Sequence, residues 1–264
     1  MNTIWMIANG TFGEAMRRKI LNVFLFVSLA IMVMGFAFSS FQPSEEMVII
    51  KSLGLGVIAL AGVFISVILF INLIPQEIER RTIYTILSKP VQRYEFLCGK
   101  FLGGLMTVFS NILLMGVSFI VLLLIKERFH WDHDITDAVK GIVMIFFQIM
   151  LLGGVSMCLS VILSPFVNFF LSFAVYLLGS MSSVTESLAA DPDHKKNPIA
   201  VLLAKVLHVA VPNFGNYNIQ NPIIHPDVVI HNETLYLMQN VLLALIWTAF
   251  LMILAVLAFD RREV

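Results

Sequence analysis

The sequence predicts an all-α polytopic membrane protein with six transmembrane helices, and three observations lead to this fold class. First, of the 264 residues 59% are hydrophobic and 13% are charged, with a mean hydropathy of +0.90, whereas a soluble domain is about half apolar and about a quarter charged. Second, six apolar runs are each close to or longer than the ~20 residues that a helix needs to cross hydrocarbon. Third, the runs are continuous rather than alternating, which favours helices over barrel strands.

These runs are expected to form a single transmembrane domain over residues 1–264. The predicted spans cover residues 20–41, 52–74, 97–125, 140–163, 166–188 and 237–259. Residues 2–19 place Trp5 among aliphatic residues and are predicted to form a helix that lies in the membrane interface. The first span lacks the cleavage site of a removed signal peptide, so we expect it to be retained.

Lysine and arginine predict the orientation, because cytoplasmic segments carry an excess of both. With six spans, ten of these residues fall on one side: Arg17, Arg18, Lys19, Arg80, Arg81, Lys89, Arg93, Lys100, Arg261 and Arg262. Seven fall on the other side, spread over longer loops: Lys51, Lys126, Arg128, Lys140, Lys195, Lys196 and Lys205. We therefore expect both termini and residues 75–100 to be cytoplasmic.

Residues 75–100 form the one long charged segment between two apolar runs. Pro75 suits the first turn of a helix and Pro90 marks its end, so residues 76–88 are predicted to form a short amphipathic helix. Its charged residues, Glu77, Glu79, Arg80 and Arg81, could pair with a partner in the aqueous phase, while Ile78, Ile83, Ile86 and Leu87 fill an apolar cleft. The alternative is a helix on the membrane surface whose arginines contact lipid phosphates.

Motifs for nucleotide binding and for catalysis are missing from the sequence. It contains no G-x-x-x-x-G-K-[ST] phosphate loop, no Gly-x-Ser-x-Gly elbow and no His-Glu-x-x-His pair. Acidic and basic residues cancel at 17 each, so net charge does not point to nucleic acid. Two polar clusters have metal-ligand chemistry, but a solvated loop explains them as well and no metal is expected: His130, Asp132, His133 and Asp134, and then Asp191, Asp193 and His194.

Polar residues inside the predicted spans are sparse, and their pattern disfavours an ion-coupled carrier or a proton relay. The candidates for a pathway or for helix contacts are Asn22, Asn72, Asn111, Gln148, Asn168 and Glu186. Hydrogen bonding between helices is the commoner role of Asn and Gln in a span. Cys98 and Cys158 are both expected to be packing residues rather than a disulfide.

Residues 189–236 form the largest predicted external region. It begins with a turn-rich stretch, residues 191–198. An amphipathic run over residues 199–208 is expected to lie on or dip into the outer leaflet. A loop rich in proline and asparagine then leads to the last span.

The order of these features resembles the permeases of ABC-2 type transporters. The residues that carry the resemblance are Glu77, Glu79, Arg80-Arg81-Thr82-Ile83, Leu87, Lys89-Pro90-Val91, Arg93-Tyr94-Glu95-Phe96 and Gly99-Lys100. In addition, Pro212-Asn213-Phe214 with Tyr217-Asn218 is similar to an external stretch in the branch labelled as multicopper-enzyme maturation permeases.

The resemblance implies a dimeric exporter in the bacterial inner membrane. Each permease, paired with a copy of itself or a paralogue, would dock a separate P-loop ATPase subunit that binds ATP and magnesium, two copies per transporter. Residues 76–88 would be the coupling helix, residues 2–19 an elbow helix, and the segment before span six an external re-entrant piece that gates the exit. Spans one, two and five would reshape the dimer interface. The alternative is a non-transporting transducer, with the same fold and ATPase, that passes a conformational change to an external partner.

Overall fold

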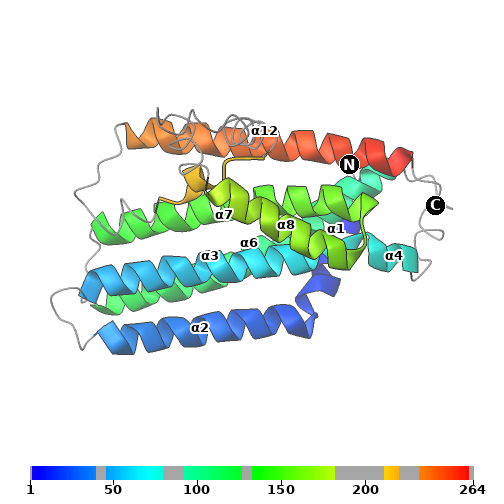
Figure 1. Cartoon of the computed structure of the whole chain (residues 1–264). Helices are drawn as coiled ribbons and strands as arrows, with labels where there is room; N and C mark the ends of the chain where they lie inside the picture. The colour runs from blue at the N-terminus through cyan, green and yellow to red at the C-terminus, as the bar shows by residue number, and fades with distance from the viewer. Residues whose placement is uncertain are drawn as a thin grey trace, which may run out of the picture.

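The structure is a computed structural model that describes residues 2–39, 46–79, 92–126, 133–181, 211–219 and 232–261. Throughout these ranges the regular structure is helical (Figure 1). The elements are α1 (Asn2–Met16), α2 (Lys19–Ser39), α3 (Glu46–Leu73), α4 (Pro75–Glu79), α6 (Arg93–Lys126), α7 (His133–Ile162), α8 (Pro165–Ser180), the 3-10 turn η2 (Gly215–Tyr217) and α12 (Glu233–Asp260).

Five of the described helices are long and apolar enough to cross a membrane: α2, α3, α6, α7 and α12. The fifth predicted span, residues 166–188, is represented by α8, which has 16 described residues and is therefore about 24 Å long at ~1.5 Å per residue. Residues 182–188 of that predicted span lie outside the described residues. The helices confirm the predicted all-α polytopic fold class.

The helices α3 and α7 form the centre of the bundle. In each of them 67% of the residues in the apolar membrane-spanning stretch are buried, compared with 22% in α2 and in α12. Around this pair, α2 packs on α3, α12 packs on α7, and both α6 and α8 contact the central pair. Phe70 of α3 fills the space beside two glycines. A Cβ atom added at Gly104 of α6 or at Gly153 of α7 would come within 2.7 or 2.5 Å of its ring. Glycine at both positions allows the three helices to approach closely.

The long helices lie roughly side by side along one axis, so the bundle has two ends (Figure 1). One end, which we name the proximal end, carries α1, α4, the start of α6 and the end of α12, as the contact between Arg93 and Phe259 shows. The opposite end, the distal end, carries the starts of α3, α7 and α12, where Lys51 meets Asp134.

Candidate functional site

The helix α4 begins at Pro75, directly after the end of α3 at the proximal end. Proline has no backbone N–H and its ring clashes inside a continuous helix, so it separates α4 from α3. The carbonyl of Ile74 accepts hydrogen bonds from the backbone N–H groups of Glu77 and Ile78, at 3.1 and 3.2 Å. The predicted amphipathic helix is therefore described only over its first turn; its remainder, to residue 88, lies outside the described residues.

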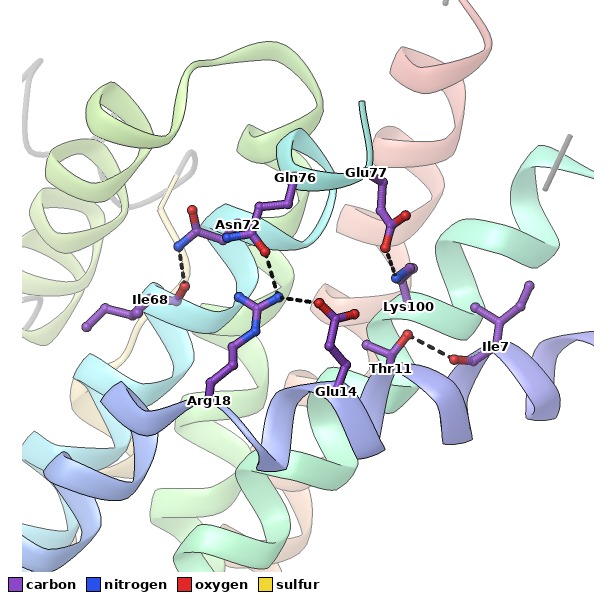
Figure 2. A network of polar contacts seen from close by, with 9 residues as sticks. All are labelled: Ile7, Thr11, Glu14, Arg18, Ile68, Asn72, Gln76, Glu77 and Lys100. Atoms are coloured by element: carbon purple, nitrogen blue, oxygen red, sulfur yellow. Dashed lines mark hydrogen bonds and ion pairs between the residues drawn. The ribbon is translucent and has the colours of Figure 1, made fainter. Parts of the chain in front are cut away.

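The side chain of Glu77 points into the protein, toward α6, rather than toward solvent. Its carboxylate accepts a hydrogen bond from the Lys100 ammonium of α6 at 2.5 Å (Figure 2). The exposed fractions of the two side chains are 14% and 7%. The Lys100 ammonium also lies 5.9 Å from the ring centroid of Phe96, within reach of a cation–π contact. The structure thus brings Glu77 and Lys100 together as a largely buried ion pair.

A second contact joins α4 to the junction between α1 and α2. The guanidinium of Arg18 donates a hydrogen bond to the side-chain oxygen of Gln76 at 2.7 Å and lies 3.5 Å from the Glu14 carboxylate (Figure 2). Because Gln76 and Glu77 are adjacent, α4 is attached on one side to α6 and on the other to the α1–α2 junction.

Glu79 differs from Glu77, because it is exposed. The remaining predicted docking residues, Arg80, Arg81, Thr82, Ile83 and Leu87, lie outside the described residues. Of the predicted docking set, the structure therefore places one acidic residue inward and one outward.

The predicted elbow helix α1 packs tightly against the start of α6. A Cβ atom at Gly99 would meet Ile7 at 2.8 Å, and one at Gly103 would meet the carbonyl oxygen of Ala8 at 2.5 Å and the Cβ of Thr11 at 2.6 Å. The two glycines thus have the spacing and the contacts of closely packed membrane helices. On the other face of α1, Trp5 and Met6 are exposed, 58% and 72%, as expected for a helix in the membrane interface.

Arg93, at the first position of α6, holds the end of α12. Its guanidinium donates to the carbonyl oxygens of Phe259 and Asp260 at 3.0 and 3.2 Å and lies 5.8 Å from the centre of the Phe259 ring. The last carbonyls of a helix have no partner within that helix, so Arg93 caps α12. We name Arg18, Gln76, Glu77, Arg93 and Lys100 the proximal cluster.

The polar residues predicted inside the spans separate into two groups. The side-chain amides of Asn72 and Asn111 donate to carbonyls one turn earlier in their own helices, at 2.8 Å each. Gln148 and Asn168 instead bond other elements: Gln148 donates to the Phe214 carbonyl at 3.0 Å, and Asn168 donates to the Ser156 carbonyl at 2.9 Å. Asn22 is exposed, and Glu186 lies outside the described residues.

Residues 211–219, which belong to the predicted external region, are packed against α7, α8 and α12. Phe214 is fully buried, and its backbone N–H donates to the Gly179 carbonyl at 3.1 Å. A Cβ atom at Gly179 would lie 2.5 Å from the Phe214 ring and 2.5 Å from the Pro212 carbonyl. The segment is thus fitted closely into the described bundle.

Two tyrosines join this segment to α12. The Tyr217 hydroxyl donates to the Asn240 carbonyl at 3.1 Å, and the Tyr236 hydroxyl donates to the Asn216 carbonyl at 2.8 Å. Burial, with a smaller contribution from Tyr236, raises the pKa of Tyr217 to about 12. Tyr217 therefore stays a neutral donor at neutral pH. The rest of the predicted external region, including residues 199–208, lies outside the described residues.

Ion pairs join three helices at the distal end. Lys51 of α3 lies 2.7 Å from Asp134 of α7, and Lys140 of α7 meets both Asp137, at 3.0 Å, and Glu233 of α12, at 2.9 Å. These partners were not predicted from the sequence, which placed the lysines only as loop charges.

The described residues contain no group of three His, Cys, Asp or Glu side chains that could hold a metal ion. Asp134 pairs with Lys51, and neither Cys98 nor Cys158 forms a disulfide. His133 is the first residue of α7. The remaining metal candidates, His130, Asp132, Asp191, Asp193 and His194, lie outside the described residues.

An apolar groove of about 340 Å³ runs between α2 and α3. Phe24, Ile31, Leu53, Leu60 and Phe64 contribute to its walls, and the only hydroxyl groups among the lining residues are those of Ser28 and Ser52. The predicted pathway residues that the structure describes do not line this groove.

The roles of Lys100, Arg93 and Arg18 in this site were not predicted from the sequence. All three residues indicated the orientation in the membrane, and Arg93 and Lys100 were also part of the family motif. Lys100 carried a further signal. It stands inside an apolar stretch between Gly99 and Phe101, and a lysine is rarely buried unless it is paired. That signal predicts a partner, but it does not say that the partner is Glu77.

The fold and the site together define an integral membrane protein of several spans, with a short helix held between its second and third long helices. Comparison with protein families agrees: residues 5–264 match the family described as ABC-2 family transporter protein. The chain belongs to this family and is the membrane-embedded permease subunit of an ABC transporter, which works with an ABC ATPase. A search of curated proteins finds no match. The narrower assignment to the multicopper branch stays a prediction.

Proposed function

We propose that this chain is an exporter subunit that couples ATP hydrolysis by a separate P-loop ATPase to movement of a substrate across the membrane. The observation that carries the proposal is the position of α4. It follows α3 at the proximal end, is attached to the α1–α2 junction through Gln76 and to α6 through Glu77, and exposes Glu79. A helix that is attached to the bundle by Gln76 and Glu77 and exposes Glu79 to solvent is suited to bind a partner.

The proposed assembly contains two ATPase subunits, which bind ATP and magnesium, and a second permease that is either a copy of this chain or a paralogue. Support for a second permease comes from α2, of which little is buried within the described chain. The ten basic residues on one side of the six spans support an orientation with both termini and α4 in the cytoplasm. The bacterial inner membrane is the location that the family resemblance implies.

In this proposal, closure of the ATPase dimer moves the coupling helices, and the permease shifts between two packings of its spans. Residues 211–219 would serve as part of the exit gate. The contacts that support this role are the hydrogen bonds of Phe214 with Gln148 and Gly179, and the two tyrosine hydrogen bonds that join the segment to α12. Opening the gate would require these bonds to break or to exchange partners.

Charge reversal at Glu79, on the exposed face of α4, and at its neighbour in the sequence, Arg80, tests the docking claim. In the E79K/R80E variant we expect membrane insertion to be normal and co-purification of the ATPase to fall at least about tenfold, because charge pairs across the contact become repulsive. The E79D/R80K variant retains both charges and is the matched control. Glu77 is left unchanged, because its reversal would also break the internal ion pair. Normal ATPase recovery with E79K/R80E would contradict docking through this face.

A further inference from the structure

We propose that Glu77 and Lys100 are positioning residues that transmit movement of α4 to α6, whereas Glu79 belongs to the surface that meets the ATPase. This inference rests on the proposed function, and it assigns separate tasks to two acidic residues of one helical turn. Glu77 would not contribute to binding the ATPase. Its carboxylate would instead keep the coupling helix attached to the membrane-spanning helices while the ATPase moves it.

The ion pair between Glu77 and Lys100 is largely buried, so it is poorly accessible to a partner protein. Glu77 and Lys100 expose only 14% and 7% of their side chains in the chain without any partner bound. Removing a charged group from water is costly unless it is paired with good geometry, and the two groups lie 2.5 Å apart. Because little of the Glu77 carboxylate can be reached from outside, a partner protein would gain little from contacting it.

Lys100 lies on the face of α6 that also contacts α12. Arg93, Phe96 and Lys100 are three and then four residues apart, a spacing that places them on one face of the helix. Through this face α6 contacts the end of α12, where Arg93 binds the carbonyls of Phe259 and Asp260 and Phe96 stacks on Phe259 at 6.2 Å. The same face binds α4 through Lys100. A displacement of α4 is therefore delivered to the helix face that also holds α12.

A second attachment limits how α4 can move. Arg18 holds Gln76 from the α1–α2 junction, while Glu77 is held by α6. With both contacts in place, α4 cannot pivot away from the bundle without pulling on α6 or on the junction. With the Glu77 contact broken, α4 can follow the ATPase while α6 stays behind. The ion pair thus decides whether movement of α4 is passed directly to α6.

The experiment compares two neighbouring glutamates in the full chain reconstituted with its ATPase. The variants are E77Q, K100Q and the exchanged pair E77K/K100E, with E79Q as the matched control. All are made in a background in which Cys98 and Cys158 are replaced by alanine. A reporter cysteine is introduced by M238C near the distal end of α12, where Met238 is 73% exposed. Two quantities are measured: the Kd for the ATPase, and the ratio of maleimide labelling rates of the reporter with and without ATP at saturating ATPase.

We expect ATP to change the labelling rate at least about fivefold in the chain with both charges, a size typical of coupling between sites. E77Q and K100Q should bind the ATPase with a Kd within about twofold of that chain and should lose the response to ATP. E77K/K100E should recover most of the response to ATP. Such a recovery would show that the single variants lose the response because the ion pair is absent, and not because the protein is generally less stable. E79Q should weaken binding and keep the response once the ATPase saturates.

Three results would overturn the inference, and they can be told apart. If the chain with both charges binds the ATPase and E77Q still responds to ATP, the positioning role is wrong and the proposed function stands. The same holds if E77Q weakens ATPase binding as much as E79Q does, because Glu77 would then be a docking residue. If the chain with both charges binds no ATPase, the proposed function fails and the positioning role fails with it.

Discussion

Gln148, at the scale of a single residue, shows how one amide can hold a loop segment inside a membrane protein. It lies near the middle of α7, is 4% exposed, and donates to the Phe214 carbonyl at 3.0 Å. Phe214 precedes the 3-10 turn η2, and its carbonyl also accepts a hydrogen bond from the Tyr217 backbone N–H at 3.3 Å. The Gln148 amide supplies the second bond to this carbonyl, and that bond joins the stretch to α7. The amide therefore stabilises the inward position of residues 211–219.

Replacing Gln148 by leucine should release this contact with little change of volume. We expect the free energy of unfolding to fall by about 1 kcal/mol, the usual net contribution of one hydrogen bond, measured as a lower midpoint of thermal unfolding in detergent. N72L is the matched control. Asn72 donates to the Ile68 carbonyl of its own helix, so its loss should cost well under about 1 kcal/mol. Equal losses in the two variants would show that the contact with Phe214 contributes nothing special.

At the scale of elements, the contact between α1 and α6 determines where the proposed elbow helix sits. The backbone of α1 approaches α6 so closely at Gly103 that any side chain there would meet the Ala8 carbonyl oxygen and Thr11. Because Arg18 follows α1 directly and holds Gln76, a shift of α1 also disturbs α4. The close glycine contact is thus linked to the position of the coupling helix.

The G103L variant should push α1 away from α6. Overpacking of this kind costs about 1 to 3 kcal/mol, so we expect a lower unfolding midpoint and weaker binding of the ATPase. G13L is the matched control, because a Cβ atom at Gly13 meets nothing within 4 Å and the added side chain has space. Wild-type behaviour of G103L in both measurements would contradict a tight α1–α6 contact.

The helix starts show why sequence reasoning predicted elements better than their ends. The apolar run predicted a span from residue 140, whereas α7 begins at His133. The extra turns carry Asp134 and Asp137, charges that read as loop when the sequence is considered alone. They are accommodated in a helix because Lys51 and Lys140 pair with them, and such tertiary partners cannot be recognised from spacing along the chain.

At the scale of the whole molecule, α12 connects the two ends of the bundle. Its last turn is held by Arg93 at the proximal end, and its first turns contact Lys140 and, through Tyr236, residues 211–219. A helix is stiff along its axis, so a displacement of one end of α12 can displace the other end. Both proposals use this connection: the coupling helix acts on the proximal end and the exit gate lies toward the distal end.

The candidate site could be predicted only in part. Pro75, the charged segment and the flanking apolar runs predicted a helix at α4, and the glycines of α6 predicted close packing. Which acidic residue of α4 turns inward could not be predicted, because Glu77 and Glu79 are chemically alike and differ only in what lies opposite. Gln148 and Asn168 bond other elements, and these partners were visible only in three dimensions; their part in a pathway or a helix interface stays a prediction.

The most direct test of the central claim is purification of the tagged full chain in mild detergent, with identification of the proteins that stay bound and measurement of the mass of the complex. We predict a stable assembly of two P-loop ATPase subunits and two permeases, of which the second is either a copy of this chain or a paralogue. A stable, folded preparation that retains no ATPase would contradict the account, and α4 would then be better explained as a helix that contacts lipid head groups.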